Sequence, residues 1–352
     1  MTPKIRAGVL GATGRIGQQF IDLLANHPLF ELSTVAASSS SAGKSYANAC
    51  HWMISDDIPE IAVDLVVQEC TPGLECDLVF SALPADQADT VEIDFANAGY
   101  PVFTNASSHR MRKDVPLLIP EVNPDHLSVL SIRNCSNEKK GYIVANPNCS
   151  AAVLVTALAP LHEAFRIKSV IVHTMQAISG AGYPGISALD LLDNVIPFVP
   201  NEEEKMALET KKMLGSFLDG QFHEAEIRFS AHCNRVSTRD GHLETVSVGF
   251  HRSPTEQEIL EVWQDWRPLP QCLNLPTAPE FPIRVRSERD RPQTLLDRNA
   301  GNGMTVTVGR LRPCEVLDFK FVALGHNAIR GAAGGSVLNA ELAHAKGFLG
   351  LS

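Results

Sequence analysis

The sequence predicts an α/β protein with two domains, and three observations lead to this prediction. The chain has 352 residues, which exceeds the size at which one hydrophobic core usually stops growing. In its N-terminal part, short apolar runs alternate with helical patterns, as they do in a parallel sheet covered by helices. In its C-terminal part, the runs are longer and alternate between apolar and polar residues, which is typical of an antiparallel sheet with one face covered.

The chain begins with an apolar run, a glycine-rich turn and a helical pattern. Residues 5–10 predict a buried strand, and Phe20, Leu23 and Leu24 stand at helical spacing after it. Glycines let a backbone approach phosphate groups, and the start of a helix offers N–H groups and a favourable dipole. The order of strand, turn and helix therefore indicates a dinucleotide site. Its predicted contacts are the turn residues Gly11, Thr13, Gly14, Arg15, Ile16 and Gly17.

A serine-rich segment follows the second predicted strand, residues 32–37. It reads Ser38-Ser39-Ser40-Ser41-Ala42-Gly43-Lys44. A site that prefers NAD usually has Asp or Glu here, roughly 20 residues beyond the glycines, to accept a hydrogen bond from the ribose 2′-hydroxyl. Serines and a nearby lysine suit a 2′-phosphate instead, so the sequence favours NADP. The alternative is a flexible serine-rich loop that binds no ligand.

The remaining elements follow from the same periodicities. Short strands are expected at 78–83, 101–104 and 142–145, and longer ones at 169–178, 243–250, 304–311 and 316–324. Helices are expected at 88–98, at 253–266, and at 151–165 with an interruption at Pro160. The Pro-rich segment 268–282 predicts a loop, and the charged run 284–291 predicts a solvated loop or a subunit contact. A small-residue turn at 331–335 precedes a last amphipathic helix.

Composition argues against several classes of protein. The formal net charge of −10 and the pI near 5.6 disfavour nucleic-acid and anionic-membrane partners, which require basic surfaces. The start Met1-Thr2-Pro3-Lys4 lacks the pattern of a signal peptide, and no apolar run approaches the roughly 18 residues that span a bilayer. Eight cysteines without a C-x-x-C pair indicate free thiols. We therefore expect a cytoplasmic protein that binds small molecules and no metal.

The stretch Asn146-Pro147-Asn148-Cys149-Ser150 lies between the apolar run 142–145 and a long helical pattern. Unpaired N–H groups at the start of a helix carry partial positive charge, so they favour the thiolate form of Cys149. That chemistry suits a nucleophile. The alternative is that Cys149 is a small buried hydrophobe, as expected of the other cysteines, which are Cys50, Cys70, Cys76, Cys135, Cys233, Cys272 and Cys314.

With Cys149 placed after a dinucleotide-binding half, the chain resembles aspartate-semialdehyde dehydrogenases of the archaeal and fungal branch over nearly its whole length. Six segments in the same order carry the resemblance. They are Gly11 to Gly17, Asn146 to Ser150, Gln176-Ala177-Ile178-Ser179-Gly180-Ala181-Gly182, Asn201-Glu202-Glu203-Glu204-Lys205, Asn234-Arg235-Val236 through Gly241-His242, and Gly325-His326-Asn327 with the following Gly-Ala-Ala-Gly-Gly. Any one segment could arise by chance, but six in order are specific.

The resemblance implies catalytic roles for four residues. Cys149 would be the nucleophile and His242 its general base and acid. Gln176 would help to place the substrate, and the backbone N–H or side-chain amide of Asn148 would face a developing oxyanion. One departure concerns His242: the family usually reads Val-Pro-Val after Arg235, whereas this chain reads Val236-Ser237-Thr238. The missing proline removes a constraint on φ, so the pose of His242 is less secured.

The resemblance also implies the binding residues. Arg235 would clamp the substrate's α-carboxylate, for which a planar bidentate donor is suited. Glu202 would receive the ammonium group, and Lys205 and Arg110 would bind phosphate. On its own, the segment Glu202 to Lys205 predicts a solvated helix start, because carboxylates are favourable there. Further cofactor contacts would come from Ser179, Gly180 and Asn327, with Ser38 and Ser39 near the 2′-phosphate.

The implied reaction is the reversible, NADPH-dependent reductive dephosphorylation of L-aspartyl 4-phosphate to L-aspartate 4-semialdehyde through a Cys149 thioester. This step serves biosynthesis of aspartate-family amino acids, including lysine, methionine and threonine. Alternatives are a related N-acetyl-glutamyl-phosphate or malonyl-CoA reductase, and a non-catalytic NADP-binding sensor. A short-chain dehydrogenase is disfavoured because no tyrosine has a lysine four residues later.

The resemblance further implies the domain organisation. A Rossmann-like NADP-binding domain would comprise residues 1–148 and 327–352. A catalytic and dimerisation domain of the α+β class, with a mixed, largely antiparallel sheet, would comprise residues 149–326. The implied assembly is a homodimer or a homotetramer, and inorganic phosphate is the expected small-molecule partner beside the substrate.

Overall fold

The computed structural model describes residues 3–133 and 141–349 and divides into two compact units. Unit 1 contains the ranges Met1–Leu118, His126–Asn146 and Ala332–Ser352, and unit 2 contains Ile119–Asp125 and Pro147–Gly331. The predicted domain ranges differ from these units by a few residues at two boundaries and by the segment Ile119–Asp125, which belongs to unit 2. Met1, Thr2 and Cys135 lie outside the described residues.

Within its described residues, unit 1 is built on one six-stranded parallel sheet with the strand order β3-β2-β1-β4-β5-β6. The strands are β1 (Ile5–Leu10), β2 (Phe30–Ala37), β3 (Gln68–Glu69), β4 (Leu78–Ser81), β5 (Pro101–Thr104) and β6 (Tyr142–Ala145). Its helices are α1 (Arg15–Leu24), α2 (Tyr46–Ala49), α3 (Glu60–Val63), α4 (Ala85–Asn97), α5 (Val129–Arg133) and α12 (Gly334–Ala345). This order is that of a dinucleotide-binding doubly wound sheet, which confirms the predicted Rossmann-like class.

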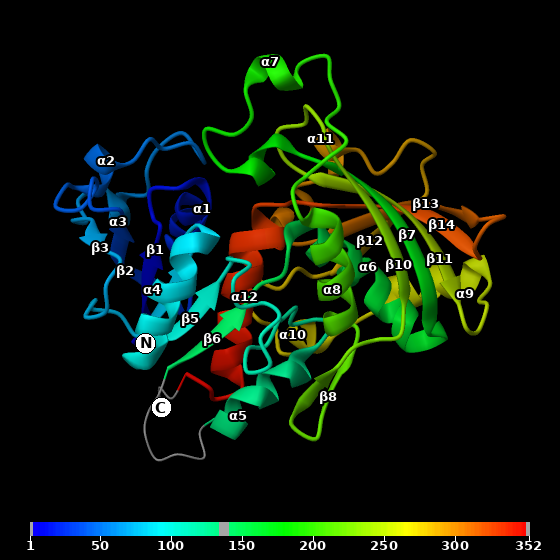
Figure 1. Cartoon of the computed structure of the whole chain (residues 1–352), viewed down its shortest axis with the longest axis horizontal. Coiled ribbons are helices and arrows are strands. Elements are labelled where there is room, and N and C mark those ends of the chain that lie inside the picture. The colour runs from blue at the N-terminus through cyan, green and yellow to red at the C-terminus, as the bar shows by residue number, and fades with distance from the viewer. Residues whose placement is uncertain (1–2, 134–140, 350–352) are drawn as a thin grey trace. The chain divides into compact units, whose positions relative to one another are not determined.

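The core of unit 1 follows from the apolar runs. Strands β4, β5 and β6 are buried at every position, as expected of parallel strands covered on both faces. Phe80 on β4 packs against the rings of Phe20, Phe30 and Phe103. Figure 1 shows α12, coloured red, which returns at the end of the chain and packs against β5 of the same sheet.

Within its described residues, unit 2 is built on a six-stranded mixed sheet with the order β10-β7-β11-β14-β13-β12. Its strands are β7 (Ile167–Gln176), β10 (Arg228–Arg235), β11 (His242–Phe250), β12 (Ile283–Arg286), β13 (Val306–Pro313) and β14 (Phe319–Gly325), and β8 (Ser216–Leu218) and β9 (Gln221–His223) form a separate hairpin. The pairs β7–β11, β11–β14 and β13–β14 are antiparallel, while β10–β7 and β12–β13 are parallel. The predicted mixed, largely antiparallel sheet is therefore confirmed.

Helices α6 (Cys149–Phe165), α8 (Glu202–Met213) and α9 (Glu256–Asp265) contact one another through α6 and pack against the unit 2 sheet. The other helices of unit 2 are α7 (Ala188–Leu191), α10 (Leu269–Cys272) and α11 (Thr294–Asp297). Helix α6 contacts β7, β11, β13 and β14, and α8 contacts β10 and α6. Short 3₁₀ segments occur at Pro124–Ser128, Ile178–Ala181 and Ala300–Gly303, and a π-helical turn spans Ile329–Ala333. This packing holds the start of α6 against the sheet.

Several predicted elements were wrong in detail. Helix α6 continues through Pro160 without an interruption, because it is buried along its length and packing outweighs the lost backbone hydrogen bond. The predicted turn at 331–335 is part of a continuous helical segment, and α12 is buried on all sides rather than amphipathic. The predicted loop 268–282 contains α10. In the charged run 284–291, residues 284–286 belong to β12, an edge strand whose Arg286 pairs with Asp297.

None of the described helices combines the length and the apolar character that crossing a membrane would require.

Candidate active site

Cys149 is the first residue of α6, and Asn148 caps this helix. Asn148 has an extended backbone with φ −51° and ψ 141°, and its Oδ1 accepts hydrogen bonds from the N–H groups of Ser150 at 2.9 Å and Ala151 at 3.1 Å. An asparagine cap of this kind fixes where a helix begins. A Cβ added to Gly331 would lie 2.6 Å from the Cβ of Cys149, so only glycine fits beside the thiol.

His242, the first residue of β11, faces this thiol. Its Nε2 lies 3.1 Å from the Cys149 Sγ, and its Nδ1 accepts a hydrogen bond of 3.0 Å from the backbone N–H of Ala177. A neutral imidazole has one N–H group and one acceptor nitrogen. Because Nδ1 is the acceptor, the proton of the neutral ring belongs on Nε2, where it points at the sulfur.

The surroundings of His242 oppose a positive charge on the ring. The side chain is fully buried, and burial together with Arg235 and His326 lowers the pKa of His242 to about 3. A Cβ added to Gly180 would lie 3.3 Å from Nε2 and 2.9 Å from the Arg235 Nη1, so the glycine keeps this corner open. The ring is therefore neutral at ordinary pH.

Arg235 and Gln176 end adjacent parallel strands and are paired in register. The Nη1 of Arg235 donates a hydrogen bond of 2.7 Å to the Ala177 carbonyl oxygen, while its Nε has no partner among the described residues. Burial is the main cause that lowers the pKa of this guanidinium from its ordinary value. A buried guanidinium with an unused donor is suited to a carboxylate ligand.

Glu202, the first residue of α8, is buried rather than solvated, so its position departs from the reading as a solvated helix start. Its Oε1 accepts hydrogen bonds from the Asn148 Nδ2 at 2.8 Å and from the Gln176 Nε2 at 2.9 Å. The backbone N–H of Asn148 donates to the Glu209 Oε2 at 2.6 Å. That N–H is therefore committed to Glu209, and only the side-chain amide of Asn148 remains for an oxyanion.

The segment between Arg235 and His242 is held by backbone hydrogen bonds instead of a proline. The Thr238 carbonyl oxygen accepts from the N–H of Ile178 at 2.8 Å, and the Arg239 carbonyl oxygen accepts from the N–H of Ser179 at 3.2 Å. Gly241, with φ +97°, donates to the Asn327 Oδ1 at 2.8 Å. These contacts secure the start of β11 and hence the pose of His242.

Two of the predicted cofactor residues in unit 2 are joined directly. The Asn327 Nδ2 donates to the Ser179 Oγ at 2.8 Å, and Gly180 follows Ser179 beside Arg235 and His242. Lys205 lies half-buried on α8, three residues after Glu202. The structure thus brings together most of the predicted residues of unit 2 around Cys149.

The glycine-rich turn in unit 1 has the predicted strand, turn and helix geometry. Gly11 has φ +72°, and Gly14 precedes the first turn of α1, which contains no acidic residue. A Cβ added to Gly17 would lie 2.2 Å from the Gly11 carbonyl oxygen. The turn therefore requires glycine for close packing of helix and strand, and it leaves the start of α1 accessible to a phosphate group.

The serine-rich segment lies at the carboxyl end of β2 and is exposed at Ser38 to Ser40. The Oγ atoms of Ser38 and Ser40 are 2.9 Å apart, and the Lys44 Nζ donates to the Ser40 carbonyl oxygen at 2.8 Å. Backbone hydrogen bonds from Ser41 and Ala42 to the Ser38 carbonyl oxygen form a turn. This segment is an ordered turn rather than an open linker.

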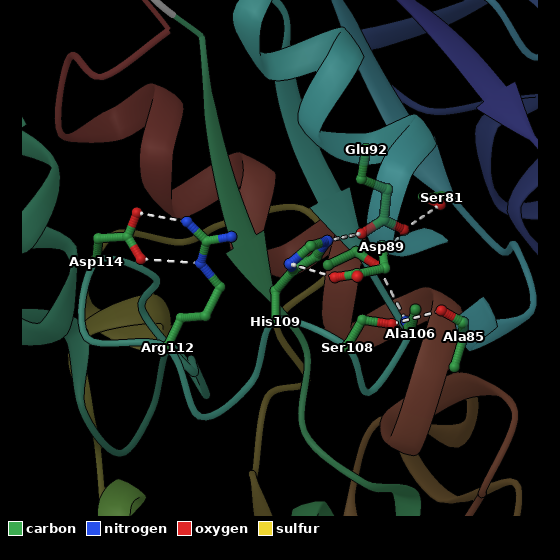
Figure 2. A network of polar contacts seen from close by, with 10 residues as sticks. Ser81, Ala85, Asp89, Glu92, Ala106, Ser108, His109, Arg112 and Asp114 are labelled. Carbon is green, nitrogen blue, oxygen red and sulfur yellow. Dashed lines mark hydrogen bonds and ion pairs between the residues drawn. The ribbon is translucent and has the colours of Figure 1, made fainter. Parts of the chain in front are cut away.

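Arg110 lies in the loop after β5 of unit 1, next to a buried ion pair. Its Nη2 donates to the Asn105 carbonyl oxygen at 2.7 Å. The preceding residue, His109, has its Nε2 3.3 Å from the Glu92 Oε2, and both side chains are fully buried. Figure 2 shows this pair together with the contact from Ser81 to Glu92. The ion pair anchors the loop that carries Arg110.

Sequence reasoning missed three residues of unit 2. Ala177 orients the ring of His242 through its backbone, Glu209 holds the Asn148 N–H, and Glu244 lies fully buried on β11. A spacing of seven from Glu202 places Glu209 on the same face of α8, so helical periodicity could have indicated it. No local pattern indicates Ala177, because its role depends on its backbone.

Among the described residues, no group of three or more His, Cys, Asp and Glu side chains could hold a metal ion.

Comparisons with known proteins agree with this site. Residues 6–130 match the family model of the semialdehyde dehydrogenase NAD binding domain, and residues 158–330 match that of the semialdehyde dehydrogenase dimerisation domain. An aspartate-semialdehyde dehydrogenase from Archaeoglobus fulgidus is 48% identical over 336 residues, which cover 95% of this chain and 96% of that protein. One from Saccharomyces cerevisiae is 44% identical over 365 residues, covering 99% of this chain and 100% of that protein.

Among solved structures, the crystal structure of aspartate semialdehyde dehydrogenase with NADP from Candida albicans is similar to the whole chain. The two share 43% identity and a TM-score of 0.91, with 98% of this chain and 99% of that chain covered. Identity of this degree over nearly the full length, together with two matching family models, confirms the predicted resemblance. The chain therefore belongs to the aspartate-semialdehyde dehydrogenase family, in the branch with archaeal and fungal members.

Proposed function

We propose that the site around Cys149 and His242 catalyses the NADPH-dependent reductive dephosphorylation of L-aspartyl 4-phosphate to L-aspartate 4-semialdehyde. One observation carries the proposal: the Cys149 Sγ lies at the start of α6, 3.1 Å from the Nε2 of a buried, neutral His242. A thiolate is favoured there by the helix N-terminus and by a donor N–H on Nε2. The comparisons give no support to the alternative acyl-phosphate or acyl-CoA reductases.

The Cys149 thiolate attacks the acyl carbon of the acyl phosphate, inorganic phosphate leaves, and the sulfur holds the acyl group as a thioester. When bound, NADPH supplies the hydride that the reaction requires. After reduction, the sulfur departs as a thiolate, to which the Nε2–H of His242 again donates. The Ala177 N–H favours this tautomer by occupying the Nδ1 lone pair. His242 therefore acts first as a hydrogen-bond donor, and its expected role as a base requires the other tautomer.

The substrate's two ends find complementary groups in unit 2. Arg235, with its unused Nε donor, is the proposed clamp for the α-carboxylate, and Glu202 is the proposed partner of the ammonium group. Gln176 and the side-chain amide of Asn148 hold Glu202 in place. Lys205 and Arg110 are the proposed phosphate ligands. Opposite charges at the two ends fix the orientation of a small zwitterionic substrate.

The residues of unit 1 fit NADP(H). Gly11 to Gly17 leave the start of α1 open for the pyrophosphate, with Thr13, Arg15 and Ile16 at the turn. The exposed hydroxyl groups of Ser38 and Ser39, without a nearby acidic side chain in the turn, suit a 2′-phosphate. Ser179, Gly180 and Asn327 are the proposed contacts from unit 2. We expect a lower KM for NADPH than for NADH, and equal values would contradict the role of the serines.

A homodimer or homotetramer is proposed from the dimerisation-domain match and from the sheet face of unit 2 that the helices leave uncovered. On that face the rings of His173 and His232 stack at 5.2 Å on neighbouring strands. We also propose a cytoplasmic location, because the free thiols suit a reducing compartment. Light scattering on the full chain separates a dimer, a tetramer and a monomer, and a monomer would contradict the assembly.

One assay tests the proposed function. NADP reduction with inorganic phosphate is measured for aspartate semialdehyde, for N-acetylglutamate semialdehyde, and for malonate semialdehyde with coenzyme A. We expect kcat/KM for aspartate semialdehyde to exceed the other two by about 100-fold or more, because buried polar groups are left unpaired by the wrong substrate. Comparable values for either competitor, or turnover that does not depend on phosphate, would overturn the proposal.

A further inference from the structure

Glu244 on β11 is a buried acidic side chain of unit 2. It is fully buried, and neither carboxyl oxygen has a hydrogen-bond partner among the described residues. Buried carboxyl groups are nearly always paired, because an unpaired one loses its hydration without compensation. Glu244 has no role in the mechanism described above. Its position therefore calls for a functional reason.

Strand register places Glu244 directly behind the active-site residues. On β11 it stands two residues after His242, so both side chains point to the same face of the sheet. Glu244 pairs in register with Thr174 on β7, and Gln176 stands two residues after Thr174. The row containing Thr174 and Glu244 thus lies next to the row containing Gln176 and His242.

The carboxylate whose charge acts on Glu244 is Glu202, the proposed partner of the substrate's ammonium group. Gln176 connects the two rows, because its Nε2 donates to the Glu202 Oε1 at 2.9 Å and lies 3.3 Å from the Thr174 Oγ1. Burial, and then the charge of Glu202, raises the pKa of Glu244 well above its ordinary value. Glu244 is therefore a neutral acid behind the Glu202 carboxylate.

A neighbouring thiol places the two carboxyl groups in one region. Cys233 pairs in register with Thr174, on the side of β7 opposite to Glu244. Burial raises the pKa of Cys233 to about 12, and Glu202, Glu203 and Glu244 add to this effect. Cys233 is therefore an uncharged thiol and adds no charge beside the two carboxyl groups.

The strands beside Glu244 place neutral side chains next to it: Ala323 lies opposite it on β14, and Thr174 lies opposite it on β7. Titratable or charged groups on the neighbouring elements include Glu202, Glu203, Lys205 and Lys212 from α8, Cys233 and Arg235 from β10, His242 from β11 and Cys149 from α6. Burial disfavours the charge of Arg235. A cation arriving at Glu202 would change this balance.

We propose that Glu244 is a positioning residue for the ammonium end of the substrate site, and that it releases a proton when the substrate's ammonium group binds beside Glu202. Before the substrate binds, Glu244 is a neutral acid. When a substrate ammonium group binds to Glu202, the O–H bond of the Glu244 carboxyl group breaks and the proton passes to solvent. Two carboxylates then face the ammonium group and Arg235. This inference rests on the proposed role of Glu202, and it deepens that role by explaining selectivity for an amino substrate.

The proposal predicts a pH-dependent preference for the ammonium group. The preference is the ratio of kcat/KM for aspartate semialdehyde to kcat/KM for succinate semialdehyde, which lacks the ammonium group. Binding that releases a proton becomes stronger as pH rises, by at most about tenfold per pH unit. We expect the ratio for the wild-type enzyme to rise by about threefold or more between pH 6 and pH 8.

Three variants make the test specific. Glu244→Gln keeps the shape of the protonated acid but cannot release a proton, so its ratio is expected to change by less than about twofold over the same range. Glu244→Asp retains a titratable group, so its ratio is expected to rise with pH as in the wild-type enzyme. Glu202→Gln is expected to lower the ratio at every pH. Thermal unfolding of each variant shows whether it is folded. If Glu244→Gln is not folded, the pH dependence of the ratio in Glu244→Asp is compared with that of the wild type instead.

The outcomes are distinguishable. A slope in Glu244→Gln equal to that of the wild type, or a flat wild-type profile, would overturn the inference and leave the proposed function intact. A wild-type enzyme without phosphate-dependent turnover of aspartate semialdehyde would overturn the proposed function itself. A Glu202→Gln variant with an unchanged ratio would contradict both the proposed ammonium site and the proton release from Glu244.

Discussion

Each unit buries a histidine and a glutamate, and the two pairs are held in opposite ways. In unit 1, Glu92 and His109 face each other at 3.3 Å as a buried ion pair. In unit 2, His242 and Glu244 share one face of β11, but neither compensates the charge of the other. Burial makes both of these groups neutral: the pKa of His242 is lowered and the pKa of Glu244 is raised.

The hydrogen bonds show the same contrast. The Glu92 Oε1 accepts from the Ser81 Oγ and from the Thr104 Oγ1, both at 2.6 Å, at the carboxyl ends of β4 and β5. Glu244 accepts none among the described residues. A buried carboxylate that accepts hydrogen bonds and pairs with a histidine stabilises a fold, whereas a buried acid without either kind of partner is poised for a ligand or a proton. The comparison predicts that substitutions of Glu92 and His109 affect stability first, and that substitutions of His242 and Glu244 affect turnover first.

The largest contrast concerns a cysteine from each unit. Cys149→Ala removes the nucleophile, so we expect kcat to fall by about 10⁴-fold or more. Cys76→Ala is the matched control, because Cys76 is a buried thiol whose pKa is raised to about 12, chiefly by burial. It should retain kcat within about twofold, since burial makes its thiol inert. Steady-state kinetics of both variants decide the point, and substantial turnover in Cys149→Ala would refute the thioester mechanism.

The two buried histidines provide the next contrast. His242→Ala removes the donor to the Cys149 sulfur and is expected to lower kcat by about 10²- to 10⁴-fold. His242→Gln can accept from the Ala177 N–H and donate with its amide, so it should recover part of this loss. His109→Ala should leave kcat within about tenfold while lowering the melting temperature. Equal kcat values for His242→Gln and His242→Ala would show that a donor at this position is not sufficient.

Stability should respond in the opposite order. Glu92→Ala removes the acceptor of two buried hydroxyl groups and the buried carboxylate that faces His109, so we expect the free energy of unfolding to fall by about 3 kcal/mol. Glu244→Gln replaces a neutral acid with a neutral amide of the same shape and should change that free energy by less than about 1 kcal/mol. Denaturant unfolding at pH 5 measures both values. A larger loss for Glu244→Gln than for Glu92→Ala would break the comparison.

Local patterns predicted the elements whose signals lie within one segment. The glycine turn and the apolar runs predicted the parallel sheet, because strands buried on both faces are apolar at nearly every position. Strands β10 and β12 were missed, since they are the edges of their sheet and Arg228–Arg235 exposes alternate polar side chains. The π-helical turn at Ile329–Ala333 was read as a break because its small residues are typical of turns.

The candidate site divides in the same way. Cys149, His242, Gln176, Glu202 and Arg235 stand in ordered motifs, so a resemblance could name them. The contacts of Ala177 and Glu244 depend on how β7 and β11 align, and no single segment of sequence contains that register. The absence of a partner for Glu244 is a property of packing in three dimensions. Sequence reasoning therefore found the reacting groups and missed the groups that set their charge.

The smallest expected effect is the pH dependence of stability, and here the two units differ in sign. For His109, the cost of burial is outweighed by the hydrogen bond and charge of Glu92, so its pKa is raised. The ion pair therefore stabilises the fold fully below about pH 6.5 and loses this effect as pH rises through the folded-state pKa. His109→Gln should be less stable than the wild type by about 1 kcal/mol at pH 6, and this difference should shrink as pH rises.

Glu244 also has a raised pKa, so its neutral form favours the folded state below about pH 4.5 and this advantage is lost as pH rises. Glu244→Gln cannot ionise, so it should match the wild type near pH 5 and become the more stable protein toward pH 9. The two variants thus diverge from the wild type at opposite ends of the pH range. Unfolding curves across pH 5 to 9 measure the free energy of unfolding of each protein. If both variants differ from the wild type in the same way across this range, the contrast between the two buried pairs is wrong.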